Sequence, residues 1–240
     1  MNLSFPSFVR TRGAMLLILG LLFFGCDLGA QESSVTPIFN GKDLAGWKGN
    51  TDLWSVKDGA IVGHSDKNVP QNEFLWSNVK VQNFYLTVDV KLTPADRNAG
   101  IQFRSKPINE HGQALGYQAD VGAGWWGKLY HEHGRGILDR NENGTAAVKP
   151  GGWNKYEILA ADHRIWTAIN GKLCVAIEDP QGELSGKIAF QIHSGSPQTV
   201  HYRNPKLTHN PKIKLAGLSE KKLVAQLRKV VEPKTNSSSR

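Results

Sequence analysis

The chain has 240 residues, with 29 Lys and Arg against 21 Asp and Glu, and a formal net charge of +8. A hydrophobic content of 40% with seven Trp and nine Phe excludes a disordered chain, and two cysteines exclude a disulfide-stapled scaffold. The charge is unevenly spread, because residues 1–30 carry +1, residues 210–240 carry +6 and residues 31–209 carry only +1. A nearly neutral body indicates no nucleic-acid partner.

The N-terminus has the pattern of a targeting segment. Arg10 and Arg12 precede an apolar run over residues 14–24, which has signal-peptide length and is short for a bilayer span. The run ends at Gly25-Cys26, which is similar to a bacterial lipoprotein cleavage box. Two alternatives stay open: lipidation of Cys26, which would anchor the protein to a membrane, or ordinary cleavage near Ala30. Both predict a signal peptide over residues 1–30 and export to the periplasm or cell envelope.

Residues 36–209 read as one large all-β domain. Asn40-Gly41, Asp58-Gly59, Asn170-Gly171 and Gln181-Gly182 are dipeptides that commonly join strands. Runs with a period of two predict strands over residues 84–92, 100–105, 117–121, 155–160, 164–169, 172–177, 186–193 and 200–203. Many short strands with no helical stretch among them predict an antiparallel β-sandwich or jelly roll.

Residues 210–240 form a basic tail in which a short amphipathic helix is expected. Ser219 is placed as its N-cap, with Leu218 and Leu223 as a hydrophobic staple. Apolar residues then recur at helical spacing as far as Val231. A helix packed on the sandwich, or a solvated tail, is favoured over a membrane or partner signal.

An ordered series of motifs resembles the 3-keto-disaccharide hydrolase domain family, formerly a domain of unknown function. The motifs lie at residues 39–47 (FNGKDLAGW), 54–61, 98–105 (NAGIQFRS), 116–120 (GYQAD), 152–156, 169–171, 186–193 (GKIAFQIH) and 201–204. The resemblance covers roughly residues 36–207 and implies a concanavalin A-like lectin/glucanase sandwich. It also implies an exported enzyme whose substrates are sugars oxidised at C3. The sequence departs from the family at Gln118, where a Glu is usual, and in the aromatic, His-rich residues 122–133.

Strand alternation predicts a polar face suited to sugar hydroxyl groups, which need paired donors and acceptors. If the apolar residues between them face the core, the other face carries Gln102, Arg104, Gln118, Asp120, Gln191, His193 and, less clearly, Arg203. Ordinary glycoside hydrolysis needs two carboxylates. Asp120 stands without Glu partners at the spacing that glucanases of this fold carry, which argues against that reaction.

A 3-keto sugar requires different chemistry, since its ketone acidifies the proton at C2. A base removes that proton, an enolate forms, and the C1 substituent leaves by β-elimination, with water adding later. We expect His193 or His131 as the base, with Asp120 orienting it or serving instead. Arg104, Arg203 or a divalent metal would stabilise the enolate oxygen. The catalytic set predicted from the sequence is therefore His193, Asp120 and Arg104.

The residues after the Gln118 strand add two hypotheses. His131 and His133, two apart on an extended segment, would point the same way and ligate a metal with Glu132 nearby, although a plain polar loop is the simpler interpretation. Trp125, Trp126 and Tyr130 would stack on sugar rings, or in part belong to the core.

Two functions that use the same face therefore stay open, and a structural protein of the cell envelope that displays the tail is a weaker third alternative. One is a hydrolase or lyase of 3-keto glycosides, and the other is a non-catalytic carbohydrate-binding module. A base and an oxyanion stabiliser in one pocket would favour the enzyme. An open aromatic platform without titratable groups would favour the binding module.

Overall fold

A computed structural model describes residues 1–3 and 35–230 of the chain. Every element described below lies within one compact unit, Ser33–Arg240. Cys26 and most of the predicted signal peptide lie outside the described residues. No helix among the described residues is both long and apolar enough to cross a membrane.

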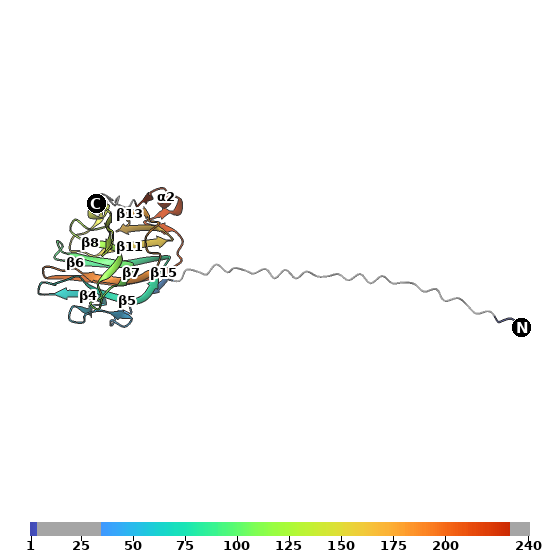
Figure 1. Ribbon diagram of the computed structural model, residues 1–240, viewed down its shortest axis with the longest axis horizontal. Helices are drawn as coiled ribbons and strands as arrows, with labels where there is room; N and C mark the ends of the chain where they lie inside the picture. Colours follow the sequence, from blue (N-terminus) through green and yellow to red (C-terminus); the bar gives the residue numbers. More distant parts are fainter. Residues whose placement is uncertain (4–34, 231–240) are drawn as a thin grey trace, which may run out of the picture. The chain divides into compact units, whose positions relative to one another are not determined.

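Two β-sheets form the body (Figure 1). The nine-stranded sheet has the order β18-β13-β12-β11-β6-β15-β4-β3, with β1 also paired to β15. Its strands are β1 (Val35–Pro37), β3 (Trp54–Lys57), β4 (Ala60–Ser65), β6 (Phe84–Thr93), β11 (Asn154–Ala161), β12 (Arg164–Ile169), β13 (Lys172–Glu178), β15 (Gln198–His209) and β18 (Arg228–Lys229). All of these pairings are antiparallel except that of β13 with β18.

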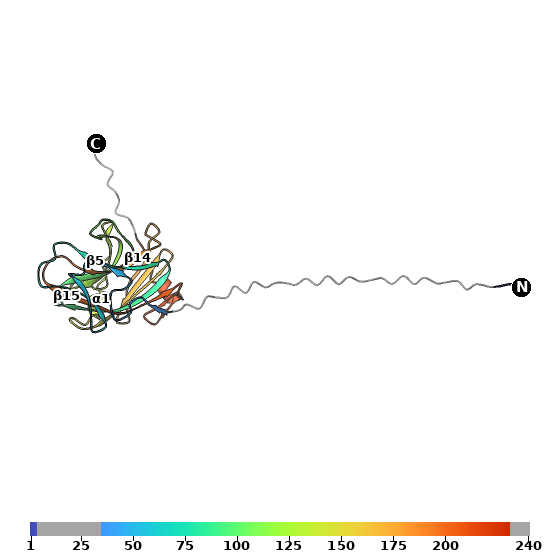
Figure 2. The same ribbon diagram turned by 90° about the horizontal axis from the view of Figure 1, so that it is seen from below.

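The seven-stranded sheet has the order β10-β9-β8-β7-β14-β5-β2 and is antiparallel throughout. Its strands are β2 (Trp47–Lys48), β5 (Glu73–Val81), β7 (Asn98–Pro107), β8 (Ala114–Gly122), β9 (Leu129–Glu132), β10 (Gly136–Asp139) and β14 (Gly186–Ile192). In Figure 2, β5 and β14 of this sheet lie in a different layer from β15 of the nine-stranded sheet. The predicted antiparallel sandwich is confirmed.

The core lies between the inward faces of the two sheets, as the period of two predicts. Ile101, Phe103 and Phe190 of one sheet are fully buried in the same cluster as Leu86 and Ile158 of the other. The Asn170-Gly171 turn joins β12 to β13 with φ values of 50° and 80°, the positive angles that a tight hairpin turn requires. The alternating residues on the opposite face of each strand are therefore left to face outward.

A short helix, α1 (Asn143–Ala147), interrupts the β body and was not expected from the sequence. Its five residues are too few to show a helical period. A Cβ at Gly144 would lie 2.1 Å from the carbonyl oxygen of Trp126, so only glycine allows this approach. The contact holds α1 against the segment that carries Trp126.

The C-terminal segment packs on the sandwich. After the small β16 (Lys214–Leu215) and β17 (Leu218–Ser219) hairpin, α2 (Glu220–Val224) begins after Ser219, at the predicted N-cap position but without a side-chain cap bond. The helix ends earlier than the apolar spacing predicts, because Arg228 and Lys229 extend the open edge of the sheet by pairing with β13. Figure 1 shows α2 beside β13, and the Leu223 carbonyl accepts a 3.1 Å bond from the indole of Trp166.

We predict that Leu223→Ala lowers the free energy of unfolding by about 2–5 kcal/mol, because Leu223 is fully buried beside Trp166. Val224→Ala is the matched control, since the Val224 side chain is next to Leu223 in the sequence but exposed. We expect it to change the free energy of unfolding by no more than about 0.5 kcal/mol. Urea denaturation followed by tryptophan fluorescence measures both. Equal effects in the two variants would show that this segment does not pack as described.

Candidate functional site

Polar side chains form two rows on the outer face of the seven-stranded sheet. The register places Gln102 opposite Gln118 and Gln118 opposite Tyr130. It also places Gly100 between Gln191 and Asp120. Since Ile101 and Ala119 belong to the core cluster, these alternating residues face away from it, as the sequence predicted.

A cavity of about 230 Å³ opens on this face. It is lined by Asn72, Asn98, Gln118, Asp120, Trp125, Tyr130, Glu132 and His193. Five of these were predicted from the sequence as site residues: Gln118, Asp120, Trp125, Tyr130 and His193. The lining combines two carboxyl groups, an imidazole, three amides and two aromatic rings, which are the groups that bind hydroxyl-rich ligands.

Asp120 is the most perturbed group of the cavity. It is only 2% exposed; its Oδ1 accepts a 2.8 Å bond from the Gln118 amide, and its buried Oδ2 has no partner among the described residues. Burial raises the pKa of Asp120 to about 8, and the nearby Glu132 carboxylate adds to this, whereas Gln118 and Lys128 oppose it. A carboxyl group with this pKa exchanges protons near neutral pH.

A chain of hydrogen bonds beneath the cavity fixes Gln118. Ser105 Oγ donates to Gln102 Oε1 at 2.7 Å, and Gln102 Nε2 donates to Gln118 Oε1 at 2.8 Å. Because its oxygen is already an acceptor, the Gln118 amide nitrogen is the group that faces Asp120. A Cβ at Gly100 would lie 2.5 Å from Gln118 Cδ, so glycine makes room for this arrangement.

Glu132, Asn72 and His193 form the other polar group of the cavity. Asn72 Nδ2 donates to Glu132 Oε1 at 3.3 Å, and Asn72 Oδ1 accepts the Ser194 backbone N–H at 2.9 Å. Burial raises the pKa of Glu132 above its usual range. His193 Nδ1 lies 2.7 Å from the Ser194 carbonyl. A carbonyl only accepts, so Nδ1 carries the proton and Nε2 of the neutral ring does not.

Three lining residues were not assigned to the site from the sequence: Asn72, Asn98 and Glu132. Asn98 was within reach of sequence reasoning, because alternation places it on the same face as Gly100 and Gln102. Its Oδ1 is buried without a partner in the described part of the chain. Glu132 lies near Asp120 because β9 pairs with β8, and the distance between the two residues along the sequence does not predict this pairing. The glucanases of this fold carry their carboxylates on one strand, whereas here the two carboxyl groups lie on the neighbouring strands β8 and β9.

The two predicted arginines do not line the cavity. Arg104 has φ of 48° beside a β-bulge that shifts the register after Phe103, so its side chain leaves the row of Gln102. Its guanidinium donates to the carbonyl of Gln82 at 2.6 and 2.8 Å and to that of Asp162 at 2.7 Å. The placement of Arg104 beside the predicted base is therefore wrong.

Arg203 lies in the nine-stranded sheet, away from the seven strands that carry the cavity. Its Nε bonds Asp89 at 3.2 Å, and its guanidinium lies 3.8 Å from the centre of the Trp153 ring. It therefore does not serve the cavity as a substrate-binding or oxyanion-stabilising group.

The two predicted metal ligands point to different partners. His131 is buried, with Nε2 2.8 Å from Glu183, whereas His133 Nδ1 bonds the Ala114 carbonyl at 3.0 Å. The strand ends at Glu132 and His133 has φ of 48°, which breaks the alternation expected to align them. Within residues 35–230, no three His, Cys, Asp or Glu side chains cluster as a metal site would require.

The aromatic and glutamine predictions divide in the same way. Trp125 and Tyr130 line the cavity as a T-shaped pair with ring centres 6.5 Å apart. Trp126 is buried in the core cluster and cannot stack on a sugar. Gln102 and Gln191 are fully buried and do not line the cavity; Gln102 supports Gln118 instead.

Comparisons with known proteins add the family. No curated protein matches the chain. A presumed glycosyl hydrolase from Parabacteroides distasonis is 21% identical with a TM-score of 0.57, covering 74% of this chain and 95% of its own. Carbohydrate-binding module CBM66 from Bacillus subtilis is 13% identical with a TM-score of 0.52, covering 68% and 95%.

A third similar structure comes from work on endo-acting O-glycanases that prominent members of the human gut microbiota express to initiate mucin breakdown. It is 13% identical with a TM-score of 0.54 and covers 74% of this chain and 99% of its own. At these identities the similarities show the fold alone. The family profile described as a 3-keto-alpha-glucoside-1,2-lyase-like domain matches residues 34–208. Because that match spans most of the sequence, the chain belongs to the 3-keto-alpha-glucoside-1,2-lyase-like domain family.

Proposed function

We propose that this protein is an enzyme that cleaves 3-keto glycosides, with Asp120 as the base that removes the proton at C2. The observation that carries the proposal is the unpartnered, buried Oδ2 of Asp120 in a cavity lined by amides and aromatic rings. A carboxylate whose pKa is raised by burial is a stronger base than an exposed one, and at about 8 it still ionises near neutral pH.

The reaction runs as a β-elimination. Asp120 Oδ2 takes the C2 proton, and the electron pair of that C–H bond forms an enolate with the C3 carbonyl. The enolate then returns to a ketone as a C1–C2 double bond forms and the bond from C1 to the glycosidic oxygen breaks. The leaving oxygen takes the proton that Asp120 removed from C2, which returns Asp120 to its carboxylate form. Addition of water across the new double bond completes a net hydrolysis.

Other lining residues have roles that fit this sequence of steps. Trp125 and Tyr130 offer aromatic faces for the sugar ring. With Arg104 and Arg203 elsewhere, the Asn98 amide nitrogen is a lining donor for the enolate oxygen. His193 Nε2 carries no proton in the neutral ring, so it serves as an acceptor for a sugar hydroxyl group. Burial is the main cause of the raised pKa of Asp120, and the negative charge of Glu132 adds to it.

A non-catalytic carbohydrate-binding module remains the second candidate. The cavity itself favours an enzyme, because it gathers two carboxyl groups with raised pKa values and an imidazole, which binding alone does not need. Asp120 and Glu132 both line the cavity, and ordinary glycosidases use two carboxyl groups, so cleavage of unoxidised sugars is also tested.

The substrate test compares a 3-keto glucoside with the same glucoside unoxidised. We expect purified protein to release the aglycone from the 3-keto form only, and to exchange the C2 proton with deuterium oxide. Chromatography and NMR follow the two events. Cleavage of the unoxidised sugar would identify a conventional glycosidase, and binding without cleavage or exchange would identify a binding module.

Asp120→Asn should abolish both cleavage and deuterium exchange while leaving the fold intact, because an amide cannot accept the proton. Asp89→Asn is the matched control, since Asp89 lies in the nine-stranded sheet and bonds Arg203. We expect its activity to equal that of the unaltered protein. Full exchange by Asp120→Asn would refute the assignment of the base.

The pH dependence of kcat/KM gives a second test, because two substitutions should shift its midpoint in opposite directions. The base acts when ionised, so kcat/KM should rise with pH through a midpoint of about 8. Glu132→Gln removes a negative charge and should move the midpoint down. Gln118→Met removes the hydrogen bond to the carboxylate and should move it up. Shifts in the same direction, or a midpoint near pH 4, would contradict this electrostatic account.

We also propose that the protein is exported through residues 1–30, on the basis of Arg10, Arg12 and the apolar run that follows them. Mass spectrometry of the protein made in a bacterial host should find a processed N-terminus. A lipid-modified Cys26, absent in Cys26→Ser, would establish an anchored protein, whereas cleavage near Ala30 would establish a free one. An unprocessed chain in the cytoplasm would contradict export.

A further inference from the structure

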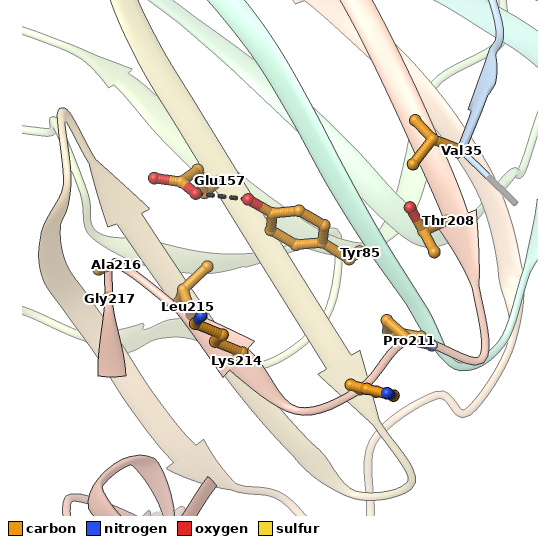
Figure 3. A pocket seen from close by; sticks show the side chains of 10 residues that line it. Val35, Tyr85, Glu157, Thr208, Pro211, Lys214, Leu215, Ala216 and Gly217 are labelled. Atoms are coloured by element: carbon orange, nitrogen blue, oxygen red, sulfur yellow. Dashed lines mark hydrogen bonds between the residues drawn. The ribbon is translucent and has the colours of Figure 1, made fainter. Parts of the chain in front are cut away.

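A second cavity, of about 380 Å³, lies on the outer face of the nine-stranded sheet. Val35, Thr208 and Tyr85 form its floor as one row across three strands, since Val35 pairs with Thr208 and Thr208 with Tyr85. Their neighbours Leu86 and Leu207 face the core, so the row faces outward. Figure 3 shows the Tyr85 ring along this floor, with Glu157 beside its hydroxyl group.

The C-terminal segment lines the side of the cavity that faces this floor. Pro211, Lys212 and residues 214–217 line the cavity. Ala216 and Gly217 have φ of 49° and 74°, the positive pair of a tight hairpin turn, and they fold β16 back on β17. Leu215 is buried within the cluster that also holds Leu223, so this side of the cavity is anchored on the sandwich.

The charges of the cavity do not cancel. The Glu157 carboxylate is 7% exposed and is already engaged, because its Oε1 lies 2.5 Å from the Tyr85 hydroxyl and 3.3 Å from Lys155 Nζ. Lys212 and Lys214 are exposed, and neither has a carboxylate within 4.0 Å among the described residues. Two cations therefore stand beside the cavity without an internal counter-ion.

Burial and the bond to Glu157 raise the pKa of Tyr85 above its usual range, so the ring stays an uncharged phenol. The cavity thus presents an aromatic ring with Pro211 and Leu215 nearby, the Thr208 hydroxyl group, and two lysines. A ligand that matches has a ring with apolar faces, hydroxyl groups, and a carboxylate or sulfate. The volume of the cavity is within the range of small-ligand sites, roughly 300–1,000 Å³.

We propose that this cavity binds an acidic sugar unit, with Tyr85 under the ring and Lys212 and Lys214 on the anionic group. The site is separate from the Asp120 cavity, since the two belong to different sheets, and it does not depend on the proposed reaction. It gives the positive charge of the C-terminal segment a specific use: recognition of acidic saccharides beside a neutral sandwich.

The test measures the Kd of the full chain by isothermal titration calorimetry with three probes: trigalacturonate, its methyl ester, and a sulfated disaccharide. We expect at least one acid to bind and the uncharged ester to bind much more weakly. Lys212→Ala/Lys214→Ala should weaken binding of the acid about tenfold, as loss of two partly exposed ion pairs implies.

Lys221→Ala/Lys222→Ala is the matched control, because it removes the same charge from exposed residues of α2 that do not line the cavity. We expect its Kd to stay within about twofold of the unaltered value. Lys212→Arg/Lys214→Arg should retain binding. Failure of both acids to bind, equal binding of the ester, or equal weakening in the two alanine variants would overturn the proposal.

Discussion

The carboxyl group of Asp120 is withdrawn from water with one oxygen bonded and the other free, and the chemistry of the cavity depends on this. Burial favours the protonated form of the acid and outweighs the opposing charge of Lys128, which brings the pKa of Asp120 from the usual acidic range toward neutrality. The surrounding amides and aromatic rings would not by themselves distinguish a catalytic cavity from a sugar-binding surface. The position of Asp120 follows from the sheet, because β8 is held between β7 and β9.

This arrangement has an energetic consequence for the fold. The pKa of Asp120 is higher in the folded chain than in the unfolded chain, so the folded state holds a proton that the unfolded state releases. Its contribution to stability is complete below pH 4 and is lost as the pH rises toward about 8. The core between the two sheets, which includes Phe103 and Phe190, offsets that cost. Packing elsewhere in the sandwich thus offsets the burial of this carboxyl group.

Much of this could be predicted from the sequence, where local rules decide the outcome. Alternation alone placed Gln118, Asp120 and His193 on one face, and the Asn-Gly turn correctly paired β12 with β13. The errors arise where tertiary structure overrides local pattern. A β-bulge turned Arg104 toward the Gln82 carbonyl, and a change of backbone angle at His133 separated it from His131.

The place of Glu132 beside Asp120 was missed, because it requires knowing that β9 pairs with β8. The sequence also predicted a longer C-terminal helix, since the apolar spacing continues past Val224, but strand pairing with β13 claims Arg228 and Lys229. Trp126 lies in the core, one of the two alternatives that the sequence left open, and its carbonyl packs closely against Gly144 of α1. In each case a contact between distant segments decided the position of the residue.

The proposed reaction requires that burial give Asp120 the pKa of a base that works near neutral pH. An NMR titration of the Asp120 side-chain carboxyl carbon, assigned by comparison with Asp120→Asn, measures this directly. We expect a single transition of this signal near pH 8. A transition near pH 4, the value of an ordinary exposed aspartate, would contradict it.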